Sequence, residues 1–396
     1  MENSAEKIGN SQDILTHLLL RLPTKSLLKF KCVSKQWLST ISNPQFCLSH
    51  TRHRQHNGFL EPTALLLKPY LTANLEFDMV PLKHYSEVPF FHYLNTSGII
   101  LRESCDGLFL CQPLDFHDHG DTRFFICNPT TKKFKILSFP SKPPTFVNLA
   151  FDPLKSLHYK VICIRPAVSD EDYDFEINIY SSETETWTAT GIDFEADEES
   201  IMFEGIMFED TVVFCNGKIH WDSVGNESLY FDVEKECLQK MPMPTLPDGS
   251  DIISDMDRYF GEARGTLYIA LAHYNLGHVD LYVFEMATDY SNWFLKRRLD
   301  LDDAMRVFPE IKLGCLLSFS GLSGLCFIQS EKEKEPKVVM WADGKIICYD
   351  FNDGSWKMLY DPGPGVKIGS NQIKGLNHLH RQRFLAFKYF ENLSCI

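Results

Sequence analysis

The chain has 396 residues, of which 44% are hydrophobic and 23% are charged, a composition that excludes a disordered or fibrous protein. Its net charge of −14 argues against general nucleic-acid binding, because that function needs a basic surface. No apolar run approaches the roughly 18 residues of a membrane helix. The start of the chain, from Met1 to Lys7, is polar and lacks an apolar secretory core. We therefore expect a soluble intracellular protein that binds no membrane and no nucleic acid.

The first 60 residues differ in charge from the rest of the chain. They carry eight Lys and Arg against three acidic residues, a net charge of +5, which leaves −19 for the remainder. A small basic region followed by an acidic body predicts two parts with different partners.

Residues 13–42 predict three short helices. The second fits residues 25–31 with Thr24 as N-cap, and the third begins near Ser34 and stops at Asn43-Pro44. In the first helix, five apolar residues share helical spacing and predict one apolar stripe: Ile14, Leu15, Leu18, Leu19 and Leu22. Three helices in about 40 residues enclose little core, so such a domain usually needs a metal, a disulfide or a partner. We expect another protein to complete this apolar surface, the alternative being that it packs on its own chain.

Three motifs follow one another in this region. They are Leu-Pro-Thr-Lys-Ser-Leu at 22–27, Cys-Val-Ser-Lys-Gln-Trp at 32–37 and Pro-Gln-Phe at 44–46. Together they resemble the F-box, in the version found in the large plant F-box family. One feature departs from that family, because Asn10-Ser11-Gln12 replaces the Leu-Pro pair that usually precedes the first helix.

The resemblance implies docking on a Skp-type adaptor and, through it, on a cullin. The adaptor-binding residues that it implies all lie in the helical region: Leu18, Leu22, Pro23, Leu27, Val33 and Trp37. The domain organisation that follows is a flexible N-terminus at 1–9, an F-box at 10–50, a linker at 51–60 and a second domain at 61–396.

Residues 61–396 show no long amphipathic helix, and one hairpin pattern recurs instead. Each copy is an apolar strand, a polar turn and a second strand that opens with a bulky residue. The copies begin at 124, 177, 229, 281 and 346, mostly 52 or 53 residues apart. Repeats of this length predict the blades of a β-propeller. The expected fold class is a small all-α N-terminal domain of three short helices followed by an all-β propeller of six, possibly seven, blades. A two-sheet sandwich is the alternative. If the propeller is closed, residues 384–387 should pair with residues 64–67.

The body also contains motifs such as Ser-Cys-Asp-Gly-Leu at 104–108 and Cys-Asn-Pro-Thr-Thr at 127–131. These resemble the F-box-associated region of plant F-box proteins, which is related to kelch propellers. An F-box followed by such a domain is the order that the family shows.

No catalytic, cofactor or metal site stands out. The twelve cysteines lack the close spacing of a zinc site, so we interpret most of them as reduced, buried hydrophobes. His50, His53 and His56 have no local carboxylate or thiolate and predict a linker or a solvated helix.

Two acidic segments flank the hairpin at 177, and we interpret them as a candidate surface for basic clients, with solvated loops as the alternative. The client-binding candidates in them are Asp170, Glu171, Asp172, Asp174, Asp197, Glu198 and Glu199.

The predicted function is that of the substrate-recognition subunit of a Skp–cullin–F-box ubiquitin ligase. It contains no catalytic residue and needs no cofactor, and it works by bringing a client protein close to the ligase. The alternatives are a kelch-like propeller enzyme and an adaptor-binding protein without ligase function. The expected location is the nucleus, the cytoplasm or both, and the client is unknown.

Overall fold

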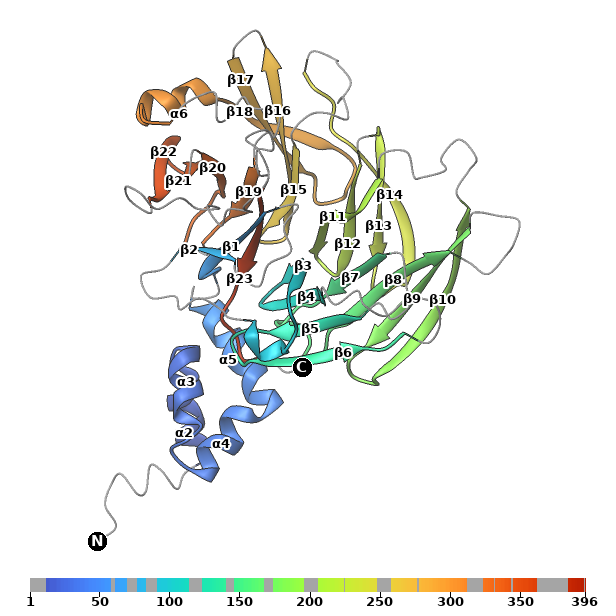
Figure 1. Ribbon diagram of the computed structural model, residues 1–396, viewed down its shortest axis with the longest axis vertical. Coiled ribbons are helices and arrows are strands. Elements are labelled where there is room, and N and C mark those ends of the chain that lie inside the picture. The colour runs from blue at the N-terminus through green and yellow to red at the C-terminus, as the bar shows by residue number, and fades with distance from the viewer. Residues whose placement is uncertain are drawn as a thin grey trace.

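A computed structural model of the chain shows a group of helices attached to one side of a ring of sheets (Figure 1). The structure describes residues 12–57, 61–69, 77–82, 91–113, 123–139, 146–166, 174–195, 206–223, 225–247, 258–275, 278–311, 323–330, 332–342, 345–361, 384–394 and 396. No helix in these ranges is both long and apolar enough to span a bilayer.

The N-terminal helices form a unit that we call the head, residues 12–57. It contains α2 (Gln12–Leu20), α3 (Thr24–Phe30), α4 (Lys35–Ser42) and α5 (Pro44–His56). Ser34 caps α4 as expected, because its hydroxyl accepts a hydrogen bond from the amide of Trp37 over 3.2 Å. Thr24 does not cap α3, since it is the first helical residue and Pro23 occupies the N-cap position.

The expected count of three helices is wrong, because α5 continues the head beyond Asn43-Pro44. The Asn43 side chain accepts hydrogen bonds from the amides of Gln45 (2.8 Å) and Phe46 (3.3 Å) and so caps the new helix. Pro44 fits the first helical position, where no amide donor is needed. The same dipeptide therefore ends one helix and begins the next, and residues 51–56 of the expected linker are helical.

Six antiparallel sheets follow and form a six-blade β-propeller. Blade 1 contains β1 (Ala64–Pro69), β2 (Asp78–Pro81) and β23 (Phe384–Tyr389). Blade 2 contains β3 (Ile99–Cys105), β4 (Leu108–Pro113), β5 (Phe124–Asn128) and β6 (Lys133–Leu137). Blade 3 contains β7 (Phe146–Ala150), β8 (Lys160–Pro166), β9 (Asp174–Ser181) and β10 (Thr186–Glu195). Blade 4 contains β11 (Ile206–Cys215), β12 (Lys218–Ser223), β13 (Glu227–Asp232) and β14 (Cys237–Pro242).

Blade 5 contains β15 (Arg258–Ala263), β16 (Thr266–Asn275), β17 (His278–Met286) and β18 (Trp293–Asp300). Blade 6 contains β19 (Ser323–Ile328), β20 (Lys337–Ala342), β21 (Lys345–Asp350) and β22 (Ser355–Tyr360). A short 3-10 helix, His92–Leu94, precedes β3, and α6 (Leu301–Val307) follows β18. The five repeated hairpins of the sequence are the third and fourth strands of blades 2 to 6, so the repeat period marks the blades correctly.

The ring is closed by strands from opposite ends of the propeller sequence. The first strand of each of blades 2 to 6 lies innermost together with β23, and each of these strands contacts its neighbours around the axis. In blade 1, β23 pairs with β1 in antiparallel register, with Ala64 opposite Tyr389 and Leu67 opposite Ala386. The predicted pairing of these two strands is confirmed, with residues 384–387 opposite 66–69, and it removes the exposed sheet edges of an open ring.

Six apolar clusters hold the blades together, one between each pair of neighbouring blades. A buried polar chain also crosses three blades. The indole of Trp221 donates to Asn148 Oδ1 (3.1 Å), and Asn148 Nδ2 donates to Glu103 Oε1 (2.6 Å). Burial raises the pKa of Glu103 to about 7, although its hydrogen bonds from Leu149 and Asn148 act in the opposite direction.

The two faces of the ring differ in what lies on them. The inner strands of blades 2, 4 and 5 end in tight turns whose two central residues all have positive φ, such as Asp106-Gly107 and Asn216-Gly217. The head lies on the side of these turns, which we call the head face. The far face is the opposite one, where the inner strands begin, and it carries α6.

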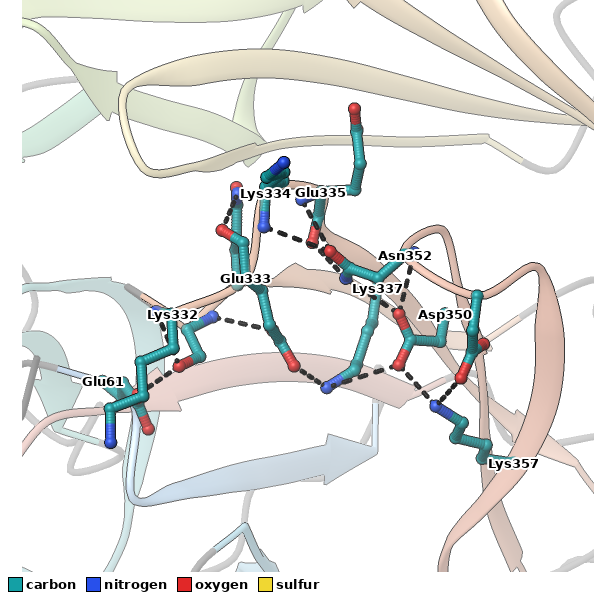
Figure 2. A network of polar contacts seen from close by, with 12 residues as sticks. Glu61, Lys332, Glu333, Lys334, Glu335, Lys337, Asp350, Asn352 and Lys357 are labelled. Carbon is teal, nitrogen blue, oxygen red and sulfur yellow. Dashed lines mark hydrogen bonds and ion pairs between the residues drawn. The ribbon is translucent and has the colours of Figure 1, made fainter.

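A charged network on the head face fixes the segment that leaves the head (Figure 2). Ser330, after β19, donates its hydroxyl to the carboxylate of Glu61, which precedes β1. Farther along blade 6, Asp350 accepts from Lys357 (2.7 Å) and lies 3.7 Å from Lys337. Burial raises the pKa of Asp350, but its bonds from Lys357 and Asn352 outweigh this and hold it at about 2. The chain therefore enters the propeller beside the head-face ends of the blade 6 strands, where Ser330 binds Glu61.

Candidate docking surface of the head

Relative to its length, the head exposes more large apolar side chains than the rest of the described residues. Nine large apolar side chains are exposed in the described residues, and four of them lie among the 46 residues of the head. These four, which we call the docking residues, are Ile14 (46% exposed), Leu18 (49%), Val33 (56%) and Leu38 (46%). A cluster of exposed apolar residues on a small domain indicates a protein-binding surface.

The docking residues lie on or beside two helices that are bonded to each other. Ile14 and Leu18 are four residues apart and share one face of α2, while Val33 and Leu38 lie on either side of the α4 N-cap. Gln12 at the start of α2 donates to the hydroxyl of Thr40 in α4 over 2.8 Å. The exposed cations Arg21 and Lys35 lie just after α2 and at the start of α4, and Lys29 lies on α3. The head thus exposes basic as well as apolar side chains.

The six predicted adaptor-binding residues divide into two groups. Leu18, Val33 and Pro23 are exposed, whereas Leu22 and Trp37 are half-buried and Leu27 is fully buried. Trp37 meets the ring of Phe30 edge to face, with centroids 5.4 Å apart. Leu22, Leu27 and Trp37 therefore support the surface from within. The predicted stripe on α2 divides in the same way, since Leu15 and Leu19 are buried while Ile14 and Leu18 are exposed.

Two of the four docking residues, Ile14 and Leu38, are not among the adaptor-binding residues predicted from the sequence. Ile14 belongs to the predicted apolar stripe, and no motif marks Leu38. Leu38 follows Trp37 directly, so it points away from the side that holds the indole. Two polar residues, Ser39 and Thr40, follow Leu38, so no apolar periodicity in the sequence marks it.

The other side of the head is covered by its own chain. Leu393, from the C-terminal end, joins the buried cluster of Leu15, Leu19, Leu27, Ile41, Phe46 and Cys47. The Arg52 guanidinium also donates to the carbonyl of Leu154, in the turn after β7, over 2.9 Å. The alternative of packing on the same chain is therefore correct for this side, while the docking residues stay uncovered.

The three histidines of α5 form no metal site. His50 is buried and its Nε2 lies 2.8 Å from the carbonyl oxygen of Leu22, while His56 is exposed. Across the described residues, no group of three His, Cys, Asp or Glu side chains is arranged to hold a metal ion. Eight of the ten cysteines that the structure describes are buried.

The predicted client-binding residues fall almost entirely outside the described residues. Asp170, Glu171, Asp172, Asp197, Glu198 and Glu199 are not described, and Asp174 is placed only as the first backbone position of β9. The strand ends that flank both segments, from β8 to β9 and from β10 to β11, lie on the far face. Of the described acidic groups near this face, Asp361 forms an ion pair with Lys345 at 2.9 Å, and Asp300 caps α6.

Comparison with known proteins agrees with this architecture. Residues 11–49 match the F-box domain family, and residues 72–256 match the family of the F-box associated beta propeller domain. F-box protein At5g07610 of Arabidopsis thaliana is 27% identical over 376 residues, which cover 91% of this chain and 87% of the relative. F-box protein At2g23160 of the same plant is 25% identical over 264 residues, 59% of this chain and 79% of the relative. F-box protein At5g49610, also of that plant, is 26% identical over 245 residues, 59% of this chain and 64% of the relative.

Proposed function

We propose that this chain is the substrate receptor of a Skp–cullin–F-box ubiquitin ligase. It carries an F-box domain, which implies binding to a Skp-type adaptor, and an F-box-associated propeller domain. The observation that carries the proposal is the division of the head into two sides. One side is covered by Leu393, and the other leaves four docking residues uncovered.

The mechanism is proximity and needs no catalytic group on this chain. The docking residues would seat the head on the adaptor, and the adaptor would connect it to a cullin. The far face of the propeller, on the side opposite the head, would hold the client at high effective concentration near the ubiquitin carrier. We infer the nucleus or the cytoplasm as the place of action.

The docking surface is tested with the double variant Leu18→Glu/Val33→Glu. Both side chains are exposed, so the head should still fold. Burying each one at an interface contributes about 1.5–3 kcal/mol, so affinity for a purified Skp-type adaptor should fall at least about tenfold. The measurement is calorimetric titration of the adaptor with the full chain.

Leu295→Glu is the matched control, because Leu295 is 43% exposed but lies on β18, outside the head. Equal affinity for the double variant and the control would contradict the assignment. Recovery of a cullin with the adaptor in a pull-down separates a ligase receptor from an adaptor-binding protein without ligase function.

A further inference from the structure

The C-terminal segment, which the structure describes at residues 390–394 and 396, joins the head to the propeller. It follows β23, the innermost strand of blade 1, and runs between blade 2 and the head helices. Leu393 is only 3% exposed because it lies in the buried cluster of the head. Leu393 is thus part of the core of the head, whereas Ile396 packs against the apolar cluster between blades 2 and 3.

Polar contacts hold Glu391 to the head on the same side. Lys25 forms an ion pair with the Glu391 carboxylate at 3.1 Å. The hydroxyl of Thr24 donates to the Glu391 carbonyl (3.3 Å) and accepts from the Arg54 guanidinium (2.8 Å). Two helices of the head, α3 and α5, therefore bind this short stretch.

The other side of the segment is bonded to two turns of blade 2. Asn392 Nδ2 donates to the carbonyl of Asp106, and Asn128 Nδ2 donates both to Asn392 Oδ1 (3.0 Å) and to the carbonyl of Ser394 (2.9 Å). The approach is close at Gly107, where a Cβ atom would lie 2.3 Å from Asn392 Nδ2 and 2.7 Å from the carbonyl oxygen of Phe390. Gly107 is therefore needed for contact with the segment as well as for its positive φ of 94°.

Comparison of the repeated hairpins shows what is special about Asn128. The position that ends the third strand and accepts hydrogen bonds from turn amides is Ser181 in blade 3, Asp232 in blade 4 and Asp350 in blade 6. Asn128 makes the same turn bonds in blade 2, with the amides of Thr130 (2.9 Å) and Thr131 (3.3 Å). Among these positions only an asparagine amide can also donate two hydrogen bonds, and Asn128 uses both on the C-terminal segment.

We propose that Asn128, Asn392 and Leu393 position the head on the propeller and so set the direction of the far face relative to the docking residues. They act through the head helices and are positioning residues. The consequence for ubiquitin transfer rests on the proposed function, because transfer depends on where the propeller points. The contact between head and propeller does not rest on it.

Hydrogen exchange of the full chain tests the contact itself, with Asn128→Asp as the main variant. The aspartate keeps the acceptor for the turn amides but loses both donors and places a carboxylate against two oxygens. The hydrogen-exchange rate should rise at least about tenfold in α3 and in residues 390–394, and stay unchanged in blades 4 and 5.

Asp232→Asn is the matched control. It replaces a carboxylate by an amide at the equivalent position of blade 4, and exchange in the head should not change. Leu393→Asp disrupts the packing of the C-terminal segment on the head rather than on blade 2, and should give the same exchange pattern as Asn128→Asp.

Ubiquitin transfer in a reconstituted ligase gives the positioning readout. In this assay the chain itself is ubiquitinated. The positions of its modified lysines show which part of the propeller faces the ubiquitin carrier. The Asn128→Asp chain, still bound to the adaptor, should spread ubiquitin over lysines that the wild-type chain leaves unmodified. The conservative variant Leu393→Met should keep the wild-type pattern.

Two results would overturn the proposal. One is unchanged exchange in α3 with both Asn128→Asp and Leu393→Asp. The other is an unchanged set of modified lysines at lower yield, which would mean that these residues only add stability. If wild-type chain receives no ubiquitin at all, the proposed function fails, while the exchange experiment still decides the contact.

Discussion

His50 is a buried titratable group that stacks on the ring of Phe46 and lies within hydrogen-bond distance of the Leu22 carbonyl oxygen. Burial lowers its pKa from the usual 6.5 to about 4, although the bond to the Leu22 carbonyl acts in the opposite direction. The nearby Arg54 and His53 also disfavour its charged form. The folded head therefore holds His50 neutral at a pH where the unfolded chain already binds a proton.

The free energy of unfolding of the head should consequently depend on pH. Between pH 6.5 and 4 the unfolded state binds more protons, so stability falls as pH falls. His50 alone should lower it by about 2 kcal/mol from pH 7.5 to pH 5. Hydrogen exchange of α5 at the two pH values measures this. His50→Gln, which keeps an amide donor toward Leu22, should lose most of the difference, and a full pH dependence in that variant would assign it to another group.

Asn148 links three blades through a single buried amide. Replacing it by leucine leaves the Trp221 indole without its acceptor and removes one of two donors to Glu103. Asn148→Leu should therefore cost about 3 kcal/mol in the free energy of unfolding, measured by urea titration.

Asn178 provides the comparison for that experiment. It is also buried, at 5% exposure, but its Nδ2 has no hydrogen-bond partner. Asn178→Leu should therefore be nearly neutral. A similar loss in both variants would mean that leucine simply does not fit in these strands.

Element by element, the sequence predicts what is repeated and local. In each of blades 2 to 6 an apolar third strand, a polar turn and a fourth strand follow one another, so this pattern recurs once per blade and identifies the blades. The start of α5 was missed because Asn-Pro is a signal both for stopping a helix and for starting one. The contacts of the C-terminal segment were missed for a different reason. Asn128 and Asn392 are 264 residues apart, and no local pattern relates them.

The strand β23 is the element on which ring closure depends. Deleting residues 383–396 removes one of the two strand partners of β1, so the side of Leu65 and Leu66 that pairs with β23 becomes an open sheet edge while the pairing with β2 remains. The truncated chain should aggregate, which light scattering after size-exclusion chromatography measures. The same deletion removes Leu393, so a chain ending at Phe390 is the necessary control. It keeps β23 and should stay soluble, and a soluble, cooperatively folding chain without β23 would contradict closure.

On the scale of the whole molecule, the head and the propeller are less separable than the sequence implies. A cut at residue 50 falls inside α5, so a headless fragment should begin at residue 58. The sequence correctly predicts that every repeated hairpin survives this cut. It does not reveal that the cut exposes Leu393, which is otherwise covered by α2 and α3.

The headless fragment should keep a folded propeller once Leu393 is replaced. We expect the fragment 58–396 with Leu393→Ser to be monomeric and to melt within about 4 °C of the propeller transition of the full chain. In cells it should hold the client without reaching the adaptor, and so lengthen the lifetime of the client. A fragment that shows no cooperative transition would mean that the two parts fold as one unit.

The pairing of β1 with β23 has a consequence for the order of synthesis. Residue 63 leaves the ribosome more than 300 residues before Tyr389, to whose carbonyl its amide is bonded. Until then the ring stays open and the head lacks Leu393, so both domains are finished by the same last dozen residues. A prematurely terminated chain would therefore lack both the closed propeller and the complete head core. If the proposed function holds, such a chain should compete poorly with the intact chain for the adaptor.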